Sequence, residues 1–167
     1  ALCGYQEVLT DPSYAGQIIT FTFPHIGHVG TNAEDTETSN LASRSGVRGA
    51  VLKADITGPS NYRSAETLGG WLKARGIVGL AGIDTRALTA LIRDKGMPNG
   101  VIAHNARGRF DVARLKKMAA GWPGLVGMDL AKDVSLTQRM EWDEKLWDWQ
   151  NGYTRAENGP WKVVAVD

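Results

Sequence analysis

Two segments near the start of the chain alternate between apolar and polar residues, and they predict β-strands. In residues 17–23 (QIITFTF), apolar side chains recur at every second position between threonines, and Pro24 closes the segment. Residues 47–56 (VRGAVLKADI) predict a second strand, which ends before Gly58 and Pro59. The intervening residues 27–40 are rich in glycine, asparagine, threonine and acidic side chains, so they predict a long surface loop.

Helical periodicity alternates with apolar strands in the middle of the chain. It predicts helices from Ala65 to Arg75 with Ser64 as N-cap, from Asp84 to Gly96, and onward from Asp111. Residues 77–83 (IVGLAGI) predict a buried strand, and residues 101–103 a short one. This alternation implies an α/β domain with helices packed on a sheet. The residues expected on one face of each helix are Leu68, Trp71, Leu72 and Arg75; the inward-facing Leu88, Leu91 and Ile92; and the inward-facing Val112, Leu115, Met118 and Ala119.

The last part of the chain has a different character. Residues 140–161 interleave tryptophan and tyrosine with charged side chains, which suits a hairpin or an arm. Aromatic pairs could pack the hairpin on itself, or the aromatic residues could contact another domain. Residues 162–167 (KVVAVD) form an apolar run typical of a buried parallel strand, so we expect the first strand of a following domain there. The expected division is 1–135, 136–161 and 162–167.

Composition narrows the class of protein. The chain carries 19 basic and 18 acidic side chains, a balance that favours neither nucleic acid nor an anionic membrane surface as partner. A single cysteine excludes an intramolecular disulfide. No apolar run approaches the roughly 18 residues of a membrane span, and the first residues lack the pattern of a leader. We therefore expect a cytoplasmic location.

Familiar catalytic and metal-binding motifs do not occur in the sequence. No GxxxxGK[ST] phosphate loop is present, and the histidines lack zinc-site spacing. His25 and His28 could share a ligand, but a polar turn is favoured. Cys3 has no histidine beside it, so an inert thiol is favoured over a nucleophile. Three clustered carboxylates favour a solvated loop over an acid–base pair; they are Glu34, Asp35 and Glu37.

Two local motifs offer binding groups. Asp11-Pro12-Ser13-Tyr14 predicts a type I turn with the Ser13 hydroxyl at an exposed corner, where it could contact a polar ligand. Asp84 opens a helix whose N-terminus could bind an anion, although capping alone also explains this residue. From these residues alone the chain is an α/β fragment without visible catalytic apparatus.

Several longer segments resemble one known family. They are 4–17 (GYQEVLTDPSYAGQ), 22–27 (TFPHIG), 30–32 (GTN), 82–89 (GIDTRALT), 93–96 (RDKG) and 124–132 (GLVGMDLAK). In wording, order and spacing they resemble the amino-terminal domain of the small subunit of carbamoyl-phosphate synthetase. The resemblance extends from Gly4 to about Val134 and returns at Val163 to Asp167. It implies a layered β/β/α domain of the swivelling type, with helices on one face of a sheet, and first strands that precede residue 1.

The resemblance also implies a function for the whole subunit. A class I glutamine amidotransferase domain after this chain would release ammonia from glutamine with a Cys-His-Glu arrangement. The large subunit would combine that ammonia with bicarbonate, using ATP and magnesium, to make carbamoyl phosphate for pyrimidine and arginine synthesis. In this chain Ser13 would contact the glutamine, and no catalytic residue, cofactor or metal is expected. The implied partners are glutamine, the chain's own carboxy-terminal glutaminase domain and the large subunit, without nucleic acid or membrane.

The sequence departs from the family pattern in a few places. Residues 1–3 (ALC) stand where many relatives have Ser-Met-Thr, and His28 stands where asparagine is common. Residues 136–161 match poorly and receive no implied role. Two other functions stay open: an autonomous module that binds a small anion at the Asp84 helix start, and a degenerate homologue that kept the scaffold but lost activity.

Overall fold

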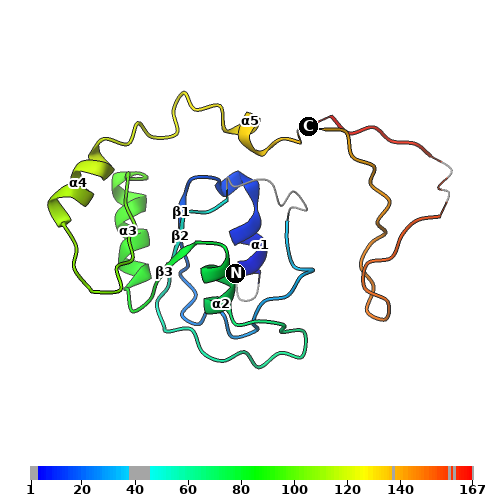
Figure 1. Cartoon of the computed structure of the whole chain (residues 1–167), viewed down its shortest axis with the longest axis horizontal. Coiled ribbons are helices and arrows are strands. Elements are labelled where there is room, and N and C mark those ends of the chain that lie inside the picture. Colours follow the sequence, from blue (N-terminus) through cyan, green and yellow to red (C-terminus); the bar gives the residue numbers. More distant parts are fainter. Residues whose placement is uncertain (1–3, 38–45, 137, 158, 160, 167) are drawn as a thin grey trace. The chain divides into compact units, whose positions relative to one another are not determined.

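A computed structural model describes residues 4–37, 46–136, 138–157, 159 and 161–166 of the chain. The chain divides into two compact units, residues 1–134 and 135–167. The first unit contains a parallel sheet of three strands in the order β1-β2-β3 (Figure 1). The strands are β1 (Ile18–Thr20), β2 (Gly49–Val51) and β3 (Val78–Leu80); the helices are α1 (Tyr5–Thr10), the 3-10 turn η1 (Pro12–Tyr14), α2 (Leu68–Ala74), α3 (Thr85–Lys95), α4 (Val112–Ala120) and α5 (Leu130–Val134).

The position of each strand in the sheet explains its burial. Ala50 of β2 pairs with Ile19 on one side and with Gly79 on the other, so β2 is the central strand and is buried throughout. The two strands predicted in 17–23 and 47–56 are confirmed, in shorter form. A strand also forms within 77–83, but the prediction that it is buried is wrong. In the described chain β3 lies at the sheet edge, where Leu80 is 45% exposed.

Helix α1 was not predicted, because it has no side chain that caps its start and is only six residues long. Tyr5 and Leu9 lie one turn apart on the same helix face, and both are buried. The helix ends at Asp11, which has an extended backbone (φ −67°, ψ 119°). Pro12 causes this ending, since a residue that precedes proline is disfavoured in the helical region.

The hydrophobic core lies between one face of the sheet and helices α1 and α2. It joins Tyr5 and Leu9 of α1 to Leu68 and Trp71 of α2, with Ala50 of the central strand beneath them. Leu68 is fully buried, and burial of one such side chain contributes about 1.5–3 kcal/mol. The arrangement confirms the predicted α/β class, with helices packed on a sheet.

Helix α2 begins three residues later than predicted. The backbone of Thr31 pairs with Glu66, and the amide of Ala65 donates to the carbonyl of Thr31 at 2.9 Å. This pairing places Glu66 in a β-bridge, so the helix starts only beyond it. Thr67 is therefore the N-cap, accepting from the amide of Gly70, and the prediction of Ser64 as N-cap is wrong.

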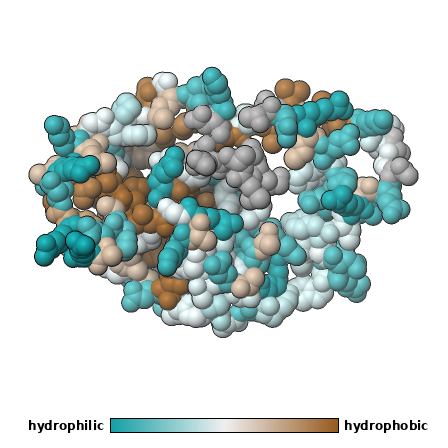
Figure 2. Space-filling view, in the orientation of Figure 1, coloured by the Kyte–Doolittle hydropathy of each residue, from teal (hydrophilic) through white to brown (hydrophobic). Residues whose placement is uncertain are grey.

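Helices α3 and α4 begin where predicted. Asp84 accepts from the amide of Ala87, and Asp111 accepts from the amide of Arg114. Their apolar stripes, however, are not buried as predicted: Leu91 is 47% exposed and Met118 is 52% exposed. The stripes therefore form apolar surface on the described first unit, which Figure 2 shows in the region of α3 and α4.

The predicted strand at residues 101–103 does not form, although the segment is close to the sheet. A Cβ atom at Gly49 would lie 2.7 Å from Cγ2 of Ile102. Ile102 therefore lies over the central strand and not beside an edge strand, so it packs on the face without joining the ladder. Glycine at position 49 provides the space for this contact.

Residues 27–37, the described part of the predicted 27–40 loop, contain no helix or strand, and residues 38–40 lie outside the described part. The predicted surface position is only partly right, because Gly27, Gly30 and Thr31 are buried. In the second unit, backbone bridges join Glu144 to Arg155 and Asp148 to Gly152, so the predicted hairpin does form. The amide of Asn151 lowers the pKa of Asp148 at its tip, and the amide of Gln150 acts in the same direction.

Aromatic side chains of the second unit remain largely exposed. Trp147 and Trp149 meet edge to face with ring centroids 6.2 Å apart, yet Trp149 is 75% exposed. Trp142 is 67% exposed as well. The hairpin thus packs only part of its aromatic surface on itself, and a contact with another domain stays a prediction. Residues 162–166 form no strand within this described unit, so their pairing in a following domain also stays a prediction.

Helix length bears on membrane insertion. The longest helix in the described residues is α3, with 11 residues. A bilayer-spanning helix needs about 20 mostly apolar residues, and none of the helices described here meets that requirement.

Candidate functional site

The turn at residues 11–14 presents Ser13 as the sequence predicts. The amide of Tyr14 donates to the carbonyl of Asp11 at 3.1 Å, which closes the turn. The side chain of Asp11 accepts twice at Oδ1, from the Ser13 amide at 2.8 Å and from the Ser13 hydroxyl at 2.6 Å. Gln17 fixes the far side by donating from Nε2 to the Ser13 carbonyl at 3.1 Å. Ser13 is exposed, so its hydroxyl lies at a held, accessible corner.

This geometry defines what Ser13 offers a ligand. A hydroxyl has one proton and two acceptor sites, and here the proton is committed to Asp11. The Ser13 oxygen therefore presents acceptor sites to solvent beside a carboxylate. An amide or ammonium group, which donates protons, is the complementary ligand chemistry. The predicted contact with glutamine fits these requirements and stays a prediction.

The loop at residues 27–37 is anchored to α1 by two buried side chains. The hydroxyl of Tyr5 donates to the carbonyl of Gly30 at 2.5 Å. The amide group of Gln6 donates to the carbonyl of Asn32 at 2.6 Å and accepts from its backbone amide at 3.0 Å. Gln6 thereby satisfies both backbone groups of Asn32, and this paired contact explains why a polar residue is buried in α1.

Two of the three clustered carboxylates form ion pairs, a contact that the prediction of a solvated loop did not include. Arg63 lies 2.8 Å from Asp35 and 3.1 Å from Glu34. Burial opposes the charge of Arg63, but the two carboxylates more than compensate and raise its pKa. Asn32 also donates to Asp35 at 2.7 Å. Because these carboxylates are held by partners, the geometry favours a structural role over acid–base chemistry.

A hollow of about 250 Å³ lies beside this ion-pair cluster. It is bounded by Tyr5, Gln6 and Glu7 of α1 and by Asp35 and Arg63 of the loop region. Burial raises the pKa of Glu7, and the charges of Asp35 and Glu37 add to the effect, while a backbone hydrogen bond and Arg63 oppose it. Ser13 is not among the lining residues, so the structure does not join the predicted glutamine contact to this hollow.

His25 and His28 form no metal centre in the described residues, where no group of three or more potential metal ligands comes together. His25 is exposed, whereas the Nδ1 atom of His28 is buried without a hydrogen-bond partner in the part of the chain described here. The ring of His28 lies near those of Tyr5 and Phe23, with centroids 6.4 and 6.3 Å away. His28 therefore packs among aromatic rings. Cys3 lies outside the described residues.

The helix start at Asp84 is already occupied by its own cap. The Asp84 carboxylate accepts from the amide of Ala87 at 3.1 Å, so an acidic group already fills the place where an anion would bind. The neighbouring Thr85 side chain is fully buried. The geometry favours capping over the anion hypothesis, which stays a prediction.

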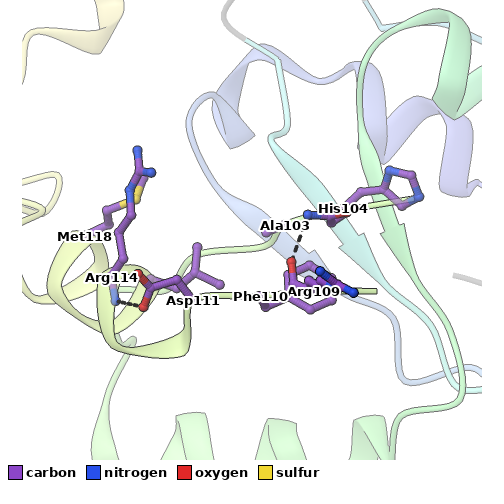
Figure 3. Close-up of a pocket in the computed structure, with 9 residues that line it drawn as sticks. Ala103, His104, Arg109, Phe110, Asp111, Arg114 and Met118 are labelled. Atoms are coloured by element: carbon purple, nitrogen blue, oxygen red, sulfur yellow. Dashed lines mark hydrogen bonds between the residues drawn. The ribbon is translucent and has the colours of Figure 1, made fainter. Parts of the chain in front are cut away.

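Sequence reasoning missed a second hollow of about 250 Å³ next to α4 (Figure 3). His104, Arg109 and Phe110 lie on one side of it, and Arg114 and Met118 of α4 lie on the other. Asn105 holds the turn at residues 105–109 by donating to the carbonyl of Arg109 at 2.8 Å. The basic residues at 107–117 were a signal in the sequence that could have indicated this site.

Comparison with known proteins identifies the family to which this chain belongs. Residues 1–102 match the family model described as the carbamoyl-phosphate synthase small chain, CPSase domain. The whole chain is 60% identical to the carbamoyl phosphate synthase small chain of Bradyrhizobium diazoefficiens and covers 42% of that protein. It is 62% identical to the small chain of Mesorhizobium japonicum, again covering 42%, and 60% identical to that of Brucella canis, covering 41%.

These matches show which class of domain the chain forms and which family it belongs to. The chain is an α/β domain of the kind found in the small chain of carbamoyl-phosphate synthase, because the matched model covers more than half of its residues. It belongs to the carbamoyl-phosphate synthase small chain family. It spans about two fifths of the length of the curated relatives it matches.

Proposed function

We propose that this chain is the amino-terminal domain of the glutamine-hydrolysing small subunit of a carbamoyl-phosphate synthase. The observation that carries the proposal is identity of about three fifths to small chains along the entire sequence. The domain acts as a scaffold that docks the subunit onto a large subunit and lends one contact to the glutamine site. The complex is a cytoplasmic ligase that uses glutamine, bicarbonate and ATP to make carbamoyl phosphate for pyrimidine and arginine synthesis.

Under this proposal the catalytic residues belong to a glutaminase domain that follows in the intact subunit, and this chain contributes binding. ATP and magnesium act on the large subunit. The constrained Ser13 hydroxyl supports a role in binding, since its oxygen is directed by Asp11 and remains exposed. An acceptor of this kind suits the ammonium or amide group of glutamine.

The test is Ser13→Ala in the intact small chain. Loss of one hydrogen bond to substrate should raise the glutamine KM by about tenfold, equivalent to about 1.4 kcal/mol. The value of kcat should fall by less, because Ser13 touches substrate and not the reacting bond. Synthesis driven by free ammonia should be unchanged.

Ser60→Ala is the matched control, because Ser60 is also exposed and lies outside the turn. A glutamine KM that is the same for Ser13→Ala and for wild type would exclude the proposed contact. Equal losses with glutamine and with ammonia would instead indicate damage to the scaffold.

The alternative function, a module that binds a small anion at Asp84, has a direct test. Calorimetric titration of this chain with phosphate, glutamine and nucleotides should give no binding heat. Binding heat with phosphate or nucleotides that grows in Asp84→Ala, which removes the competing carboxylate, would argue for the alternative.

A further inference from the structure

The hollow beside α4 combines an apolar floor with a rim of cations. Phe110 is 47% exposed and Met118 is 52% exposed, and both line the hollow together with Leu115. Arg109 and Arg114 approach it from two sides (Figure 3). Neither guanidinium has a hydrogen-bond or ion-pair partner among the described residues, in contrast to Arg63 with its two carboxylates.

Charge is distributed unevenly around this hollow. Residues 107–117 contain five of the 19 basic side chains but only one of the 18 acidic ones. That single carboxylate, Asp111, is committed to the amide of Arg114 at the start of α4. The local excess of positive charge is therefore not neutralised within the described unit, although the whole chain is nearly neutral.

The size and composition of the hollow indicate the kind of ligand. A volume of about 250 Å³ is below the 300–1,000 Å³ typical of small-molecule and cofactor pockets, so it suits one large apolar side chain. Exposed arginine, phenylalanine and methionine are residue types enriched at protein interfaces. Nucleic acid is a poorer fit, since the sequence pI is about 8.1 and nucleic-acid-binding domains typically exceed 9.

We propose that the surface formed by His104, Arg109, Phe110, Arg114 and Met118 docks an acidic segment of the large subunit. An apolar side chain of that segment enters the hollow, and carboxylates on either side of it pair with Arg109 and Arg114. The partner's identity rests on the proposed function. The acidic, apolar character of the docked segment follows from charge complementarity with this surface.

The experiment measures the affinity of the intact small chain for the large subunit by calorimetry, with a double charge reversal, Arg109→Glu and Arg114→Glu. Reversing two charges at a docking site should raise the Kd of the complex by about tenfold or more. The effect should shrink between about 0.05 and 0.5 M salt, as screening requires. Phe110→Ser should also weaken binding, and this loss should change little with salt.

Lys53→Glu with Lys73→Glu is the matched control, because both lysines are exposed, lie elsewhere and give the same change in net charge. Its Kd should stay within about twofold of wild type. Far-ultraviolet circular dichroism and thermal melting check the fold of each variant, and the milder pair Arg109→Gln with Arg114→Gln provides a second measurement.

Four outcomes would overturn the proposal. Unchanged affinity in the double reversal would remove the surface from the docking interface, while the glutamine test at Ser13 would still decide the proposed function. Equal weakening by the control pair would show that the loss of affinity comes from the change in net charge and not from this surface. Binding to phosphatidylserine vesicles or single-stranded DNA that is lost in the double reversal, with large-subunit affinity unchanged, would assign the surface to those ligands. A wild-type chain that does not bind the large subunit would remove this proposal together with its partner.

Discussion

The carboxyl group of Glu7 lies on α1 where its surroundings disfavour a negative charge. Burial is the largest cause of its raised pKa, and Asp35 and Glu37 add repulsion. A raised folded-state pKa means that folding favours the protonated carboxyl. The associated stability is fully present below the unfolded pKa of about 4.5 and is lost as pH rises through the folded pKa.

Glu7→Gln should therefore stabilise the chain at pH 7, because the amide keeps the shape without the charge. The gain in melting temperature should disappear below about pH 4, where the carboxyl is protonated in both states. Thermal melting between pH 3.5 and 7.5 in parallel with wild type measures this. Glu66→Gln is the control, since it makes the same substitution at an exposed residue outside α1. A gain that is constant across the pH range would contradict an electrostatic cause.

The contacts of single residues could be predicted from the sequence only where one short motif determines them. The Asp11-Pro12-Ser13-Tyr14 sequence predicts its own turn and exposes Ser13, because all of the bonds that hold it are local. The contacts of Arg63 with residues 34 and 35 could not be predicted in this way. They join positions 28 and 29 residues apart, and only the folded loop brings those positions together.

Capping determines where the exposed helices begin. Asp84 accepts from the amide of Ala87 at 3.1 Å, and Gly96 ends the helix with a backbone φ of 83°. Because much of α3 is solvent-exposed, little tertiary packing replaces a lost cap. Local signals of this kind are why both ends of α3 and the start of α4 were predicted correctly.

Asp84→Ala should lower the free energy of unfolding by about 1 kcal/mol, since it leaves an N-terminal amide of α3 without its partner. Asp84→Asn keeps an oxygen in the same place and should lose much less. Urea denaturation of the two variants and wild type gives the comparison. Equal losses in both variants would show that the charge of Asp84, and not its hydrogen bond, stabilises the helix start.

Non-local contacts explain the elements that were predicted wrongly. The start of α2 moved from Ser64 to Thr67 because Thr31 pairs with Glu66, a contact across 35 residues. Residues 101–103 have strand-like composition, but Ile102 packs over Gly49 on the face of the sheet. Helix periodicity marked an apolar stripe on α4 without showing whether a neighbour covers it. A stripe that faces solvent has the same sequence pattern as one in a core.

The two units of the molecule differ in how they are stabilised. The first unit has a core of large side chains that includes Leu68 and Trp71. The second unit is a hairpin with backbone bonds between Lys145 and Thr154 and between Asp148 and Gly152. Its aromatic side chains are mostly exposed, and isolated two-stranded hairpins are marginally stable in water. Stability should therefore be high in the first unit and low in the second.

Hydrogen exchange on Leu68→Ala tests this difference for the whole molecule. Removing a fully buried leucine should cost about 2–5 kcal/mol and lower protection of the Ala50 and Val51 amides by about 30-fold or more. The weak protection of the Asp148 and Gly152 amides should not change, because local opening already limits it. Leu146→Ala is the control, since Leu146 is 92% exposed and its loss should leave the first unit unaffected. If Leu68→Ala lowers protection in the hairpin as well, the two units unfold together, and the inference of an independently marginal hairpin is wrong.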